Sequence, residues 1–179
     1  MAAYRLSTPL TAEALVALRC GDQALLSGVV YAARDCAHRR MIEALERGES
    51  LPFKPEGAAI YYVGPTPAPF GLVIGSAGPT TSGRMDAYAP KLYDLGVKAT
   101  IGKGRRNVLV REAMVRNQAV YLAATGGAGA LLAEHIVRAS VIAFPDLGPE
   151  AVMELVFEDF PTIVANDILG NELYPPVHI

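Results

Sequence analysis

Apolar runs of strand length alternate with helix-like segments through the middle of this chain. The run ALLSGVVYAA, residues 24–33, is rich in β-branched and other apolar side chains, which is typical of a buried strand. The next segment, residues 34–49, spaces its apolar residues like an amphipathic helix, with an acidic residue near its start and a glycine at its end. This alternation predicts an α/β fold around a mixed sheet, or around two sheets.

The same pattern continues towards the C-terminus. Further elements are expected as follows: strands at 58–65, 70–78, 97–104 and 119–127, helices within 82–96, 108–117 and 128–139, and three final strands at 140–144, 152–159 and 162–167. Pro90 must lie early in its helix or break it. Alternation alone suggests a doubly wound sheet, but the strand-rich ends favour a less regular α/β arrangement.

Size and composition predict one soluble domain spanning residues 1–179. Apolar residues make up 51% of the chain, charged residues make up 19%, and the formal net charge is -2, which gives no reason to expect nucleic-acid binding. No apolar run reaches the roughly 18 residues of a transmembrane helix, and the first residues lack a signal-peptide core. We therefore expect no membrane association and a cytoplasmic location.

Cysteine usage excludes several cofactor arrangements within this chain. The two cysteines, Cys20 and Cys36, are too far apart for a CxxC pair, and the three histidines form no cluster. We therefore expect no metal site, no disulfide framework and no iron–sulfur cluster held in the usual cysteine-rich way by this chain alone.

The stretch SAGPTTSGRMD, residues 76–86, carries more polar chemistry than a turn needs. Thr80, Thr81 and Ser82 are suited to cap a helix and to leave its first amides free for an anion. Arg84 adds a planar guanidinium that matches a carboxylate. The alternative is an ordinary capped helix with a surface arginine.

A second candidate group follows the first buried strand, in RDCAHRR, residues 34–40. Arg34, Asp35 and His38 come where α/β proteins place ligand-binding groups. Since His38 is four residues beyond Arg34, the two side chains can share one helix face. His38 has the chemistry of an acid, a base or a hydrogen-bond donor. The alternative is a helix surface with a salt bridge.

Two glycine-rich turns complete the set of candidates. In GKG, residues 102–104, the glycines let the backbone approach a ligand and Lys103 offers a positive charge, with a simple turn as the alternative. The turn ATGGAGAL, residues 124–131, lacks the spacing and the Lys-Ser/Thr of a P-loop, so we interpret Gly126 and Gly127 as a tight turn near the site. Three turns after expected strands each carry a cation, and together they are suited to clamp a dianion.

These segments, taken together and in order, resemble a known family. The motifs RDCAHRRMIE, GPTTSGRMD, GKG, TGGAGAL, DLGPEAVMELVFEDFP and NDILGNELY are similar to the β subunit of the class I (iron–sulfur) fumarase and L(+)-tartrate dehydratase family, which is equivalent to the C-terminal domain of its single-chain enzymes. The resemblance implies a swivelling β/β/α domain with a mixed sheet and flanking helices. It also implies a partner α subunit that carries a [4Fe–4S] cluster on three cysteines, with an open iron position as Lewis acid.

The resemblance further implies the reversible hydration of fumarate to L-malate and assigns roles to the candidate residues. Arg34, Arg84 and Lys103 would bind the dicarboxylate substrate, and Thr80 would be the base. His38 matches a histidine assigned as catalytic in the tartrate branch. We infer ourselves that Asp35 orients His38 or Arg34. Three more residues are expected to support the site: Thr81, Gly126 and Gly127.

Several alternatives stay open at this point. The chain is also similar to L(+)-tartrate dehydratase β subunits, since fumarate, malate and tartrate all need a two-carboxylate clamp, although the similarity through GPTTSGRMD and TGGAGAL favours fumarase. A non-catalytic dicarboxylate-binding module is a second alternative, and a nucleotide-binding protein, based on ATGGAGAL alone, is a third. An apolar face left exposed without a partner would also permit a β–β dimer.

Overall fold

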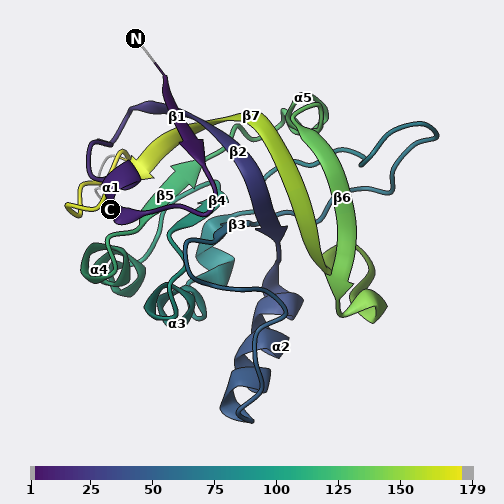
Figure 1. The fold of residues 1–179 in the computed structure, drawn as a ribbon, viewed down its shortest axis with the longest axis horizontal. Helices are drawn as coiled ribbons and strands as arrows, with labels where there is room; N and C mark the ends of the chain where they lie inside the picture. The colour runs from purple at the N-terminus through teal and green to yellow at the C-terminus, as the bar shows by residue number, and fades with distance from the viewer. Residues whose placement is uncertain (1–2, 175–179) are drawn as a thin grey trace, which may run out of the picture.

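The computed structural model describes residues 3–174, and its strands form one mixed sheet (Figure 1). The strands are β1 Tyr4–Ser7, β2 Gln23–Ala32, β3 Ala59–Tyr61, β4 Ala99–Gly102, β5 Val120–Ala123, β6 Ile136–Ala143 and β7 Val152–Asn166. The helices are α1 Ala12–Leu15, α2 Asp35–Glu46, α3 Ala89–Asp94, α4 Val108–Arg116 and α5 Gly129–Ala133, with 3-10 turns η1 Ser82–Met85 and η2 Pro145–Glu150. The prediction of an α/β protein with a mixed sheet and flanking helices is confirmed.

The sheet combines a parallel part with one long antiparallel strand. Strands β1 to β5 lie side by side in chain order and are all parallel. Strand β7 runs antiparallel to β5, β2 and β6. Because β7 pairs with both β5 and β2, the strands β2, β3, β4, β5 and β7 form a closed circuit. The sheet is therefore not the open doubly wound sheet that alternation alone suggests.

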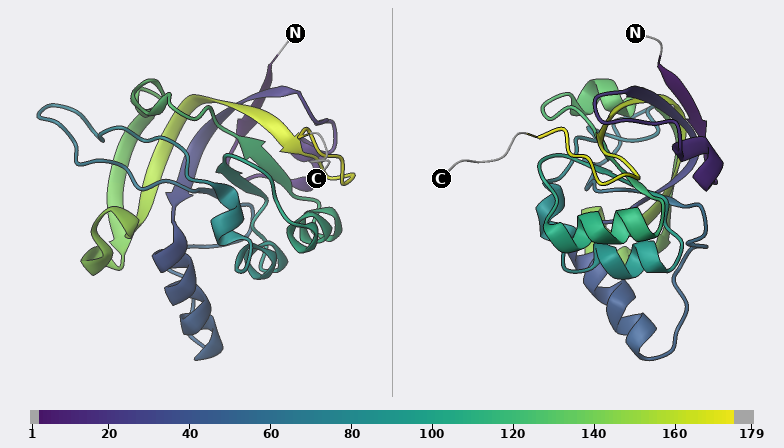
Figure 2. Two further views of the ribbon diagram at one scale, coloured as in Figure 1. Left: turned by 180° about the vertical axis from the view of Figure 1, so that it is seen from behind. Right: turned by 90° about the vertical axis from the view of Figure 1, so that its left-hand side faces the viewer.

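The parallel connections place the helices on one side of the sheet. Parallel neighbours need a crossover, usually a helix. Here α2 connects β2 to β3, η1 and α3 connect β3 to β4, and α4 connects β4 to β5. Figure 1 and Figure 2 show α3 and α4 packed side by side, with α2 projecting beyond them. The carboxyl ends of four strands thus meet at the edge from which these connections begin.

Two hydrophobic cores lie on the two faces of the parallel strands. Successive strand residues point to opposite faces. Tyr61 of β3 and Leu122 of β5 pack into the core inside the circuit, together with Phe157 of β7. Ile60 and Tyr121 pack into the other core, beneath the helices. Burial on both faces explains why these strands appear in the sequence as nearly continuous apolar runs.

The largest difference from expectation is at residues 70–78, which form no strand. Instead, residues 65–77 form an extended loop, which we call the arm, and which reaches past β6 (Figure 2). The legs of the arm are tied together, because the Thr66 N–H donates to the Ser76 carbonyl (3.1 Å) and the Gly75 N–H donates to the Thr66 carbonyl (3.2 Å). Three prolines within 65–69 remove the amide donors that a sheet ladder needs.

The C-terminal elements also differ from expectation. The helix expected at 128–139 is limited to α5, and residues from Ile136 on belong to β6. The two strands expected at 152–159 and 162–167 are one strand, β7. Asp159, with φ of 47°, and Pro161 form an irregular stretch of β7 rather than a turn. Pro90 lies at the start of α3, as expected.

Candidate active site

The candidate residues come together at the carboxyl edge of the parallel strands. Arg34 and Asp35 follow β2, Thr80 lies in the segment that returns after β3, and Lys103 follows β4. The glycine turn after β5 reaches the same edge. The strand pattern predicts this grouping for Arg34 and Lys103, because the carboxyl ends of neighbouring parallel strands share one edge of the sheet. Thr80 reaches the edge by another route, since the strand expected before it at 70–78 does not form.

Backbone hydrogen bonds hold Thr80 beside Lys103. The Thr80 N–H donates to the Tyr62 carbonyl (2.7 Å), and the Lys103 N–H donates to the Thr80 carbonyl (3.2 Å). The Ser82 N–H then donates to the Lys103 carbonyl (2.8 Å), so residues 80–82 continue the sheet as an extra pairing at the end of β4. Gly102 permits this close approach, since a Cβ there would lie 2.0 Å from the Ser82 Oγ.

The expected helix cap is wrong in its details. The turn after Thr81 is the short 3-10 turn η1, and Thr81 makes no side-chain capping bond. The Ser82 amide is already bonded to Lys103 and is not free for an anion. Thr81 is exposed, and its backbone pairs with Lys103 in a parallel bridge. The groups at this edge that are suited to an anion are therefore the side-chain cations rather than the Ser82 amide.

Asp35 connects the two candidate arginines. The Arg84 Nε donates to the Asp35 Oδ1 at 2.8 Å, and the Arg34 Nε lies 3.9 Å from the Asp35 Oδ2. Asp35 is therefore placed to orient Arg34 and Arg84, while His38 makes its contact elsewhere. The Arg84 side chain is 49% exposed. Within residues 3–174 no other side-chain partner of Arg84 is found, so its terminal nitrogens remain available to a ligand.

Glu150 is a site residue that sequence reasoning missed. Its Oε1 lies 3.4 Å from the Arg34 Nη2, and its Oε2 accepts the Cys36 N–H at 3.0 Å. Arg34 also passes close to Gly64, where a Cβ would lie 2.5 Å from its Nη1. The motif DLGPEAV contains this glutamate, but nothing in the sequence pairs it with a residue so far away in the chain.

His38 lies behind the site rather than on its surface. Its side chain is fully buried, and its Nδ1 is 2.8 Å from the carbonyl oxygen of Arg34. The ring packs edge-on against Tyr62, with 5.4 Å between centroids. Burial away from water lowers the pKa of His38 to about 4, so the imidazole is neutral at pH ~7. His38 and Arg34 therefore do not present their side chains on one exposed helix face, because the His38 side chain is buried.

A buried arginine supports the loop that carries Thr80 and Arg84. The Arg106 side chain is 0% exposed and its Nε donates to the Asp86 Oδ1 at 2.7 Å. The guanidinium lies between the rings of Tyr62 and Tyr121, at 5.3 and 5.1 Å from their centroids. The Asp86 Oδ2 accepts the Asn107 N–H at 2.7 Å, which completes the carboxylate's contacts. Of the three cations within residues 103–106, Arg106 is therefore structural and not part of a clamp.

The glycine turn after β5 lies against Lys103. A Cβ at Gly126 would be 3.5 Å from the Lys103 Cδ and 3.8 Å from its Nζ, so the lysine side chain passes over this glycine. Gly127 has a φ of 81°, a conformation that favours glycine. The turn is thus close to the site, as expected. Lys103 itself is exposed and makes no ion pair within the described residues 3–174.

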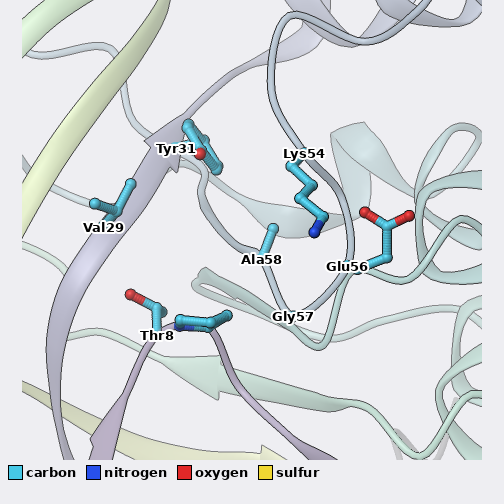
Figure 3. A pocket seen from close by; sticks show the side chains of 8 residues that line it. Thr8, Val29, Tyr31, Lys54, Glu56, Gly57 and Ala58 are labelled. Carbon is cyan, nitrogen blue, oxygen red and sulfur yellow. The ribbon is translucent and has the colours of Figure 1, made fainter.

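A separate hollow lies away from this edge (Figure 3). It has a volume of about 200 Å³ and is lined by residues after β1, on β2 and before β3, among them Thr8, Tyr31, Lys54 and Glu56. None of the candidate residues lines it. Within residues 3–174 no three His, Cys, Asp or Glu side chains are grouped to hold a metal ion. No helix in that range has the length and apolar character to cross a membrane.

Comparison with known proteins identifies the family of this chain. The family model described as Fumarase C-terminus matches residues 2–177, and the chain belongs to that family. The resemblance inferred from the motifs is therefore confirmed.

Particular relatives fall into two groups. The chain is 40% identical over 156 residues to Fumarate hydratase 2 of Leishmania major, covering 86% of this chain and 28% of that protein. It is 40% identical over 175 residues to a Putative L(+)-tartrate dehydratase subunit beta of Methanocaldococcus jannaschii, covering 94% and 90%. It is 34% identical over 173 residues to the L(+)-tartrate dehydratase subunit beta of Escherichia coli K12, covering 94% and 85%. The chain thus spans little more than a quarter of the fumarate hydratase but most of each β subunit.

Proposed function

We propose that this chain is the β-type subunit of an iron–sulfur hydro-lyase that reversibly hydrates fumarate to L-malate. The observation that carries the proposal is the convergence of Arg34, Arg84, Thr80 and Lys103 at one edge of the sheet. Similarity to Fumarate hydratase 2 and to two β subunits supports the reaction class.

The cations act on the substrate carboxylate next to the reacting carbon. The C3 proton of malate is weakly acidic, and its removal places negative charge on the adjacent carboxylate. Arg84 and Lys103 are suited to stabilise that charge more strongly in the transition state than in the ground state. Arg34, held between Asp35 and Glu150, would bind the other carboxylate with the remaining face of its guanidinium.

Thr80 would take the C3 proton. Its backbone is fixed on both sides, to Tyr62 and to Lys103, and its side chain is half-buried, so the hydroxyl has a defined position. A hydroxyl is a weak base at its ordinary pKa and needs activation by its surroundings, and the backbone contact with Lys103 brings a residue that carries a positive charge to this segment. The catalytic role of His38 stays a prediction, and its burial favours a neutral ring that acts by holding the Arg34 backbone.

The cluster would be held by a partner. No three His, Cys, Asp or Glu side chains within residues 3–174 are grouped for a metal, so the side chains of this range do not fit a [4Fe–4S] cluster. The proposal therefore includes an α subunit that holds the cluster, whose open iron would supply a Lewis acid for the hydroxyl group that leaves as water. The closed strand circuit supports a swivelling β/β/α domain, and a cytoplasmic location and a β–β dimer stay predictions.

An anaerobic fumarate-hydration assay tests the proposal. We expect no turnover by this chain alone and turnover when it is mixed with a cluster-loaded α-type chain. In the mixture, Thr80→Ala should lower turnover by far more than about threefold. A threefold change corresponds to roughly 0.65 kcal/mol in activation free energy. Thr11→Ala, at the exposed start of α1 and outside the candidate residues, is the control and should change turnover by less than about threefold. No turnover of any dicarboxylate by a formed complex with an intact cluster would overturn the proposal and favour a non-catalytic binding module or a different substrate.

The second candidate is dehydration of L(+)-tartrate. It is favoured by one observation: the relatives named as tartrate dehydratase β subunits match this chain over 90% and 85% of their length. The same assembled enzyme should be offered L-malate and L-tartrate separately. A higher kcat/KM with tartrate would make the chain a tartrate dehydratase subunit, and a higher value with malate would support the fumarase assignment.

A further inference from the structure

The arm exposes apolar side chains that a solvated loop has no reason to carry. Phe70 is fully exposed at its tip, and Leu72 and Val73 are also exposed. Residues 57–83 contain no Asp, Glu, Lys, Arg or His. Protein–protein interfaces have this composition at their centres, where charged residues are depleted and aromatic residues enriched. A contiguous apolar surface of this kind is normally covered in the working protein.

The arm is also preorganised. Besides the two backbone bonds between its legs, the Ser76 N–H donates to the Thr66 Oγ1 at 2.8 Å. Its base is anchored in the core, since the Tyr61 hydroxyl donates to the Ala77 carbonyl at 2.6 Å and the Ala77 N–H donates to the Gly129 carbonyl at 2.9 Å. A loop held in one conformation loses little entropy when it binds.

Hollows lie on both sides of the arm. One, of about 470 Å³, lies between the arm and α5 and is lined by Leu72, Val73 and Ala133. The other, of about 320 Å³, lies between the arm and β6, where Val73 and Val141 line it together with Met153. The projecting phenyl ring and the two flanking apolar hollows make a surface that can both insert into a partner and receive side chains from it.

We propose that this arm surface, formed by Phe70, Leu72, Val73 and Val141, is where the cluster-bearing α-type chain docks. The inference rests on the proposed function, because that function needs a second polypeptide at the carboxyl edge. The arm begins directly after Gly64, which contacts Arg34, and its return leg leads to Thr80. A chain that completes the site must approach this same segment. The fumarate hydratase relative, in which this region is 28% of the length, has a large remainder that could cover it.

The test measures the dissociation constant between this chain and its cluster-loaded α-type chain by anaerobic sedimentation. Phe70→Ser should weaken binding at least about tenfold, as expected for an aromatic anchor at an interface. Leu169→Ser removes another exposed apolar side chain, from the turn after β7, and is the control, which should bind like the unchanged chain. Because both side chains are exposed, neither substitution should alter thermal unfolding of the isolated chain.

The outcomes separate the docking surface from the function. A loss of less than about threefold with Phe70→Ser, while the unchanged chain binds the α-type chain, overturns the docking surface and leaves the proposed function intact. A homodimer of the isolated chain that Phe70→Ser dissociates, with α-chain binding unaffected, also overturns it, because the arm would then bind a second copy. Failure of the unchanged chain to bind the α-type chain overturns the proposed function, and the inference falls with it.

Discussion

Two layers of charge lie at the carboxyl edge of the sheet, and they are built differently. In the outer layer, Arg84 is half-exposed and bound to Asp35 through its Nε, and Lys103 is exposed with no ion pair among the described residues. In the inner layer, Arg106 is completely buried and bonds to Asp86, Thr100 and Tyr62. The outer cations keep donors available for a ligand, and the inner one uses its donors within the protein.

The difference separates binding from positioning. An arginine whose nitrogens all form hydrogen bonds within the protein cannot also bind a substrate. It can instead hold in place the loop that carries the substrate-binding groups. Asp86 comes two residues after Arg84, so the ion pair with Arg106 anchors the end of η1. The Ser82 hydroxyl lies 2.8 Å from the Tyr121 hydroxyl and anchors its start. The outer layer should therefore control activity, and the inner layer should control stability.

The strongest test of this division uses adjacent arginines. Arg106→Met leaves the Asp86 carboxylate buried and unpaired, and we expect it to lower the free energy of unfolding by about 3–5 kcal/mol. Arg105→Met makes the same chemical change at a partly exposed residue, whose Nε lies 3.7 Å from a Glu172 oxygen, and should cost less than about 1 kcal/mol. Urea unfolding of the isolated chain measures both. Equal losses for the two variants would contradict a structural inner layer.

The outer layer is tested by turnover. Arg84→Gln in the assembled enzyme should lower kcat/KM about 100-fold, because a cation that stabilises developing charge is removed. Arg39→Gln is the control, since Arg39 is exposed on α2 and its one ion pair among the described residues is with Glu43, at 4.0 Å. Its turnover should stay within about threefold of the unchanged enzyme. A similar small effect for Arg84→Gln would remove this arginine from the clamp.

Sequence patterns predict the outer layer better than the inner one. Arg34 and Lys103 could be predicted at the carboxyl edge, because each follows an apolar run that forms a strand, whereas Thr80 reaches this edge although the strand expected before it at 70–78 does not form. By contrast, Arg105 and Arg106 are adjacent and chemically identical, and only the packing of Tyr62 and Tyr121 around one of them separates the roles. Long-range partners of this kind leave no local signal.

Local patterns also misjudge segments whose structure depends on distant pairing. FGLVIG, residues 70–75, has strand-like composition, yet none of the strands in the described part of the chain pairs with it and it forms part of the arm. The proline at 161 predicts a break, but pairing with β2 on one side carries β7 through it. Glu150 is opposite Arg34 only because η2 folds back over the start of α2. These features follow from tertiary contacts.

The buried His38, which lies near Arg106 of the inner layer, predicts that the stability of the chain depends on pH. His38 has a pKa of about 4 in the folded chain, chiefly because burial disfavours its charged form. The nearby charge of Arg106 also lowers this pKa, while the contact with the Arg34 carbonyl and the charge of Asp35 raise it. An exposed histidine in the unfolded chain has a pKa near 6.5. Between these two pKa values the unfolded chain binds more protons than the folded chain. The free energy of unfolding therefore decreases as the pH falls through this range.

The expected loss is about 2 kcal/mol of unfolding free energy between pH ~7.5 and pH ~5. Urea unfolding at the two pH values measures it. His38→Gln, which cannot titrate, should show a pH dependence that is smaller by this amount, although the substitution lowers stability at both values. An unchanged slope in His38→Gln would mean that other groups cause the acid sensitivity and that His38 is not held neutral by its surroundings.

The smallest expected effect is that of the outer arginine, Arg84, on the stability of the fold. Arg84→Gln should change the free energy of unfolding of the isolated chain by less than about 1 kcal/mol, because its ion pair with Asp35 lies at the surface and is screened by water. Urea unfolding at low and high salt measures it, and added salt should reduce the difference further. A loss as large as that of Arg106→Met would show that the outer pair also holds the fold together. The division between a binding layer and a positioning layer would then be wrong, since both layers would be needed to keep Thr80 in place.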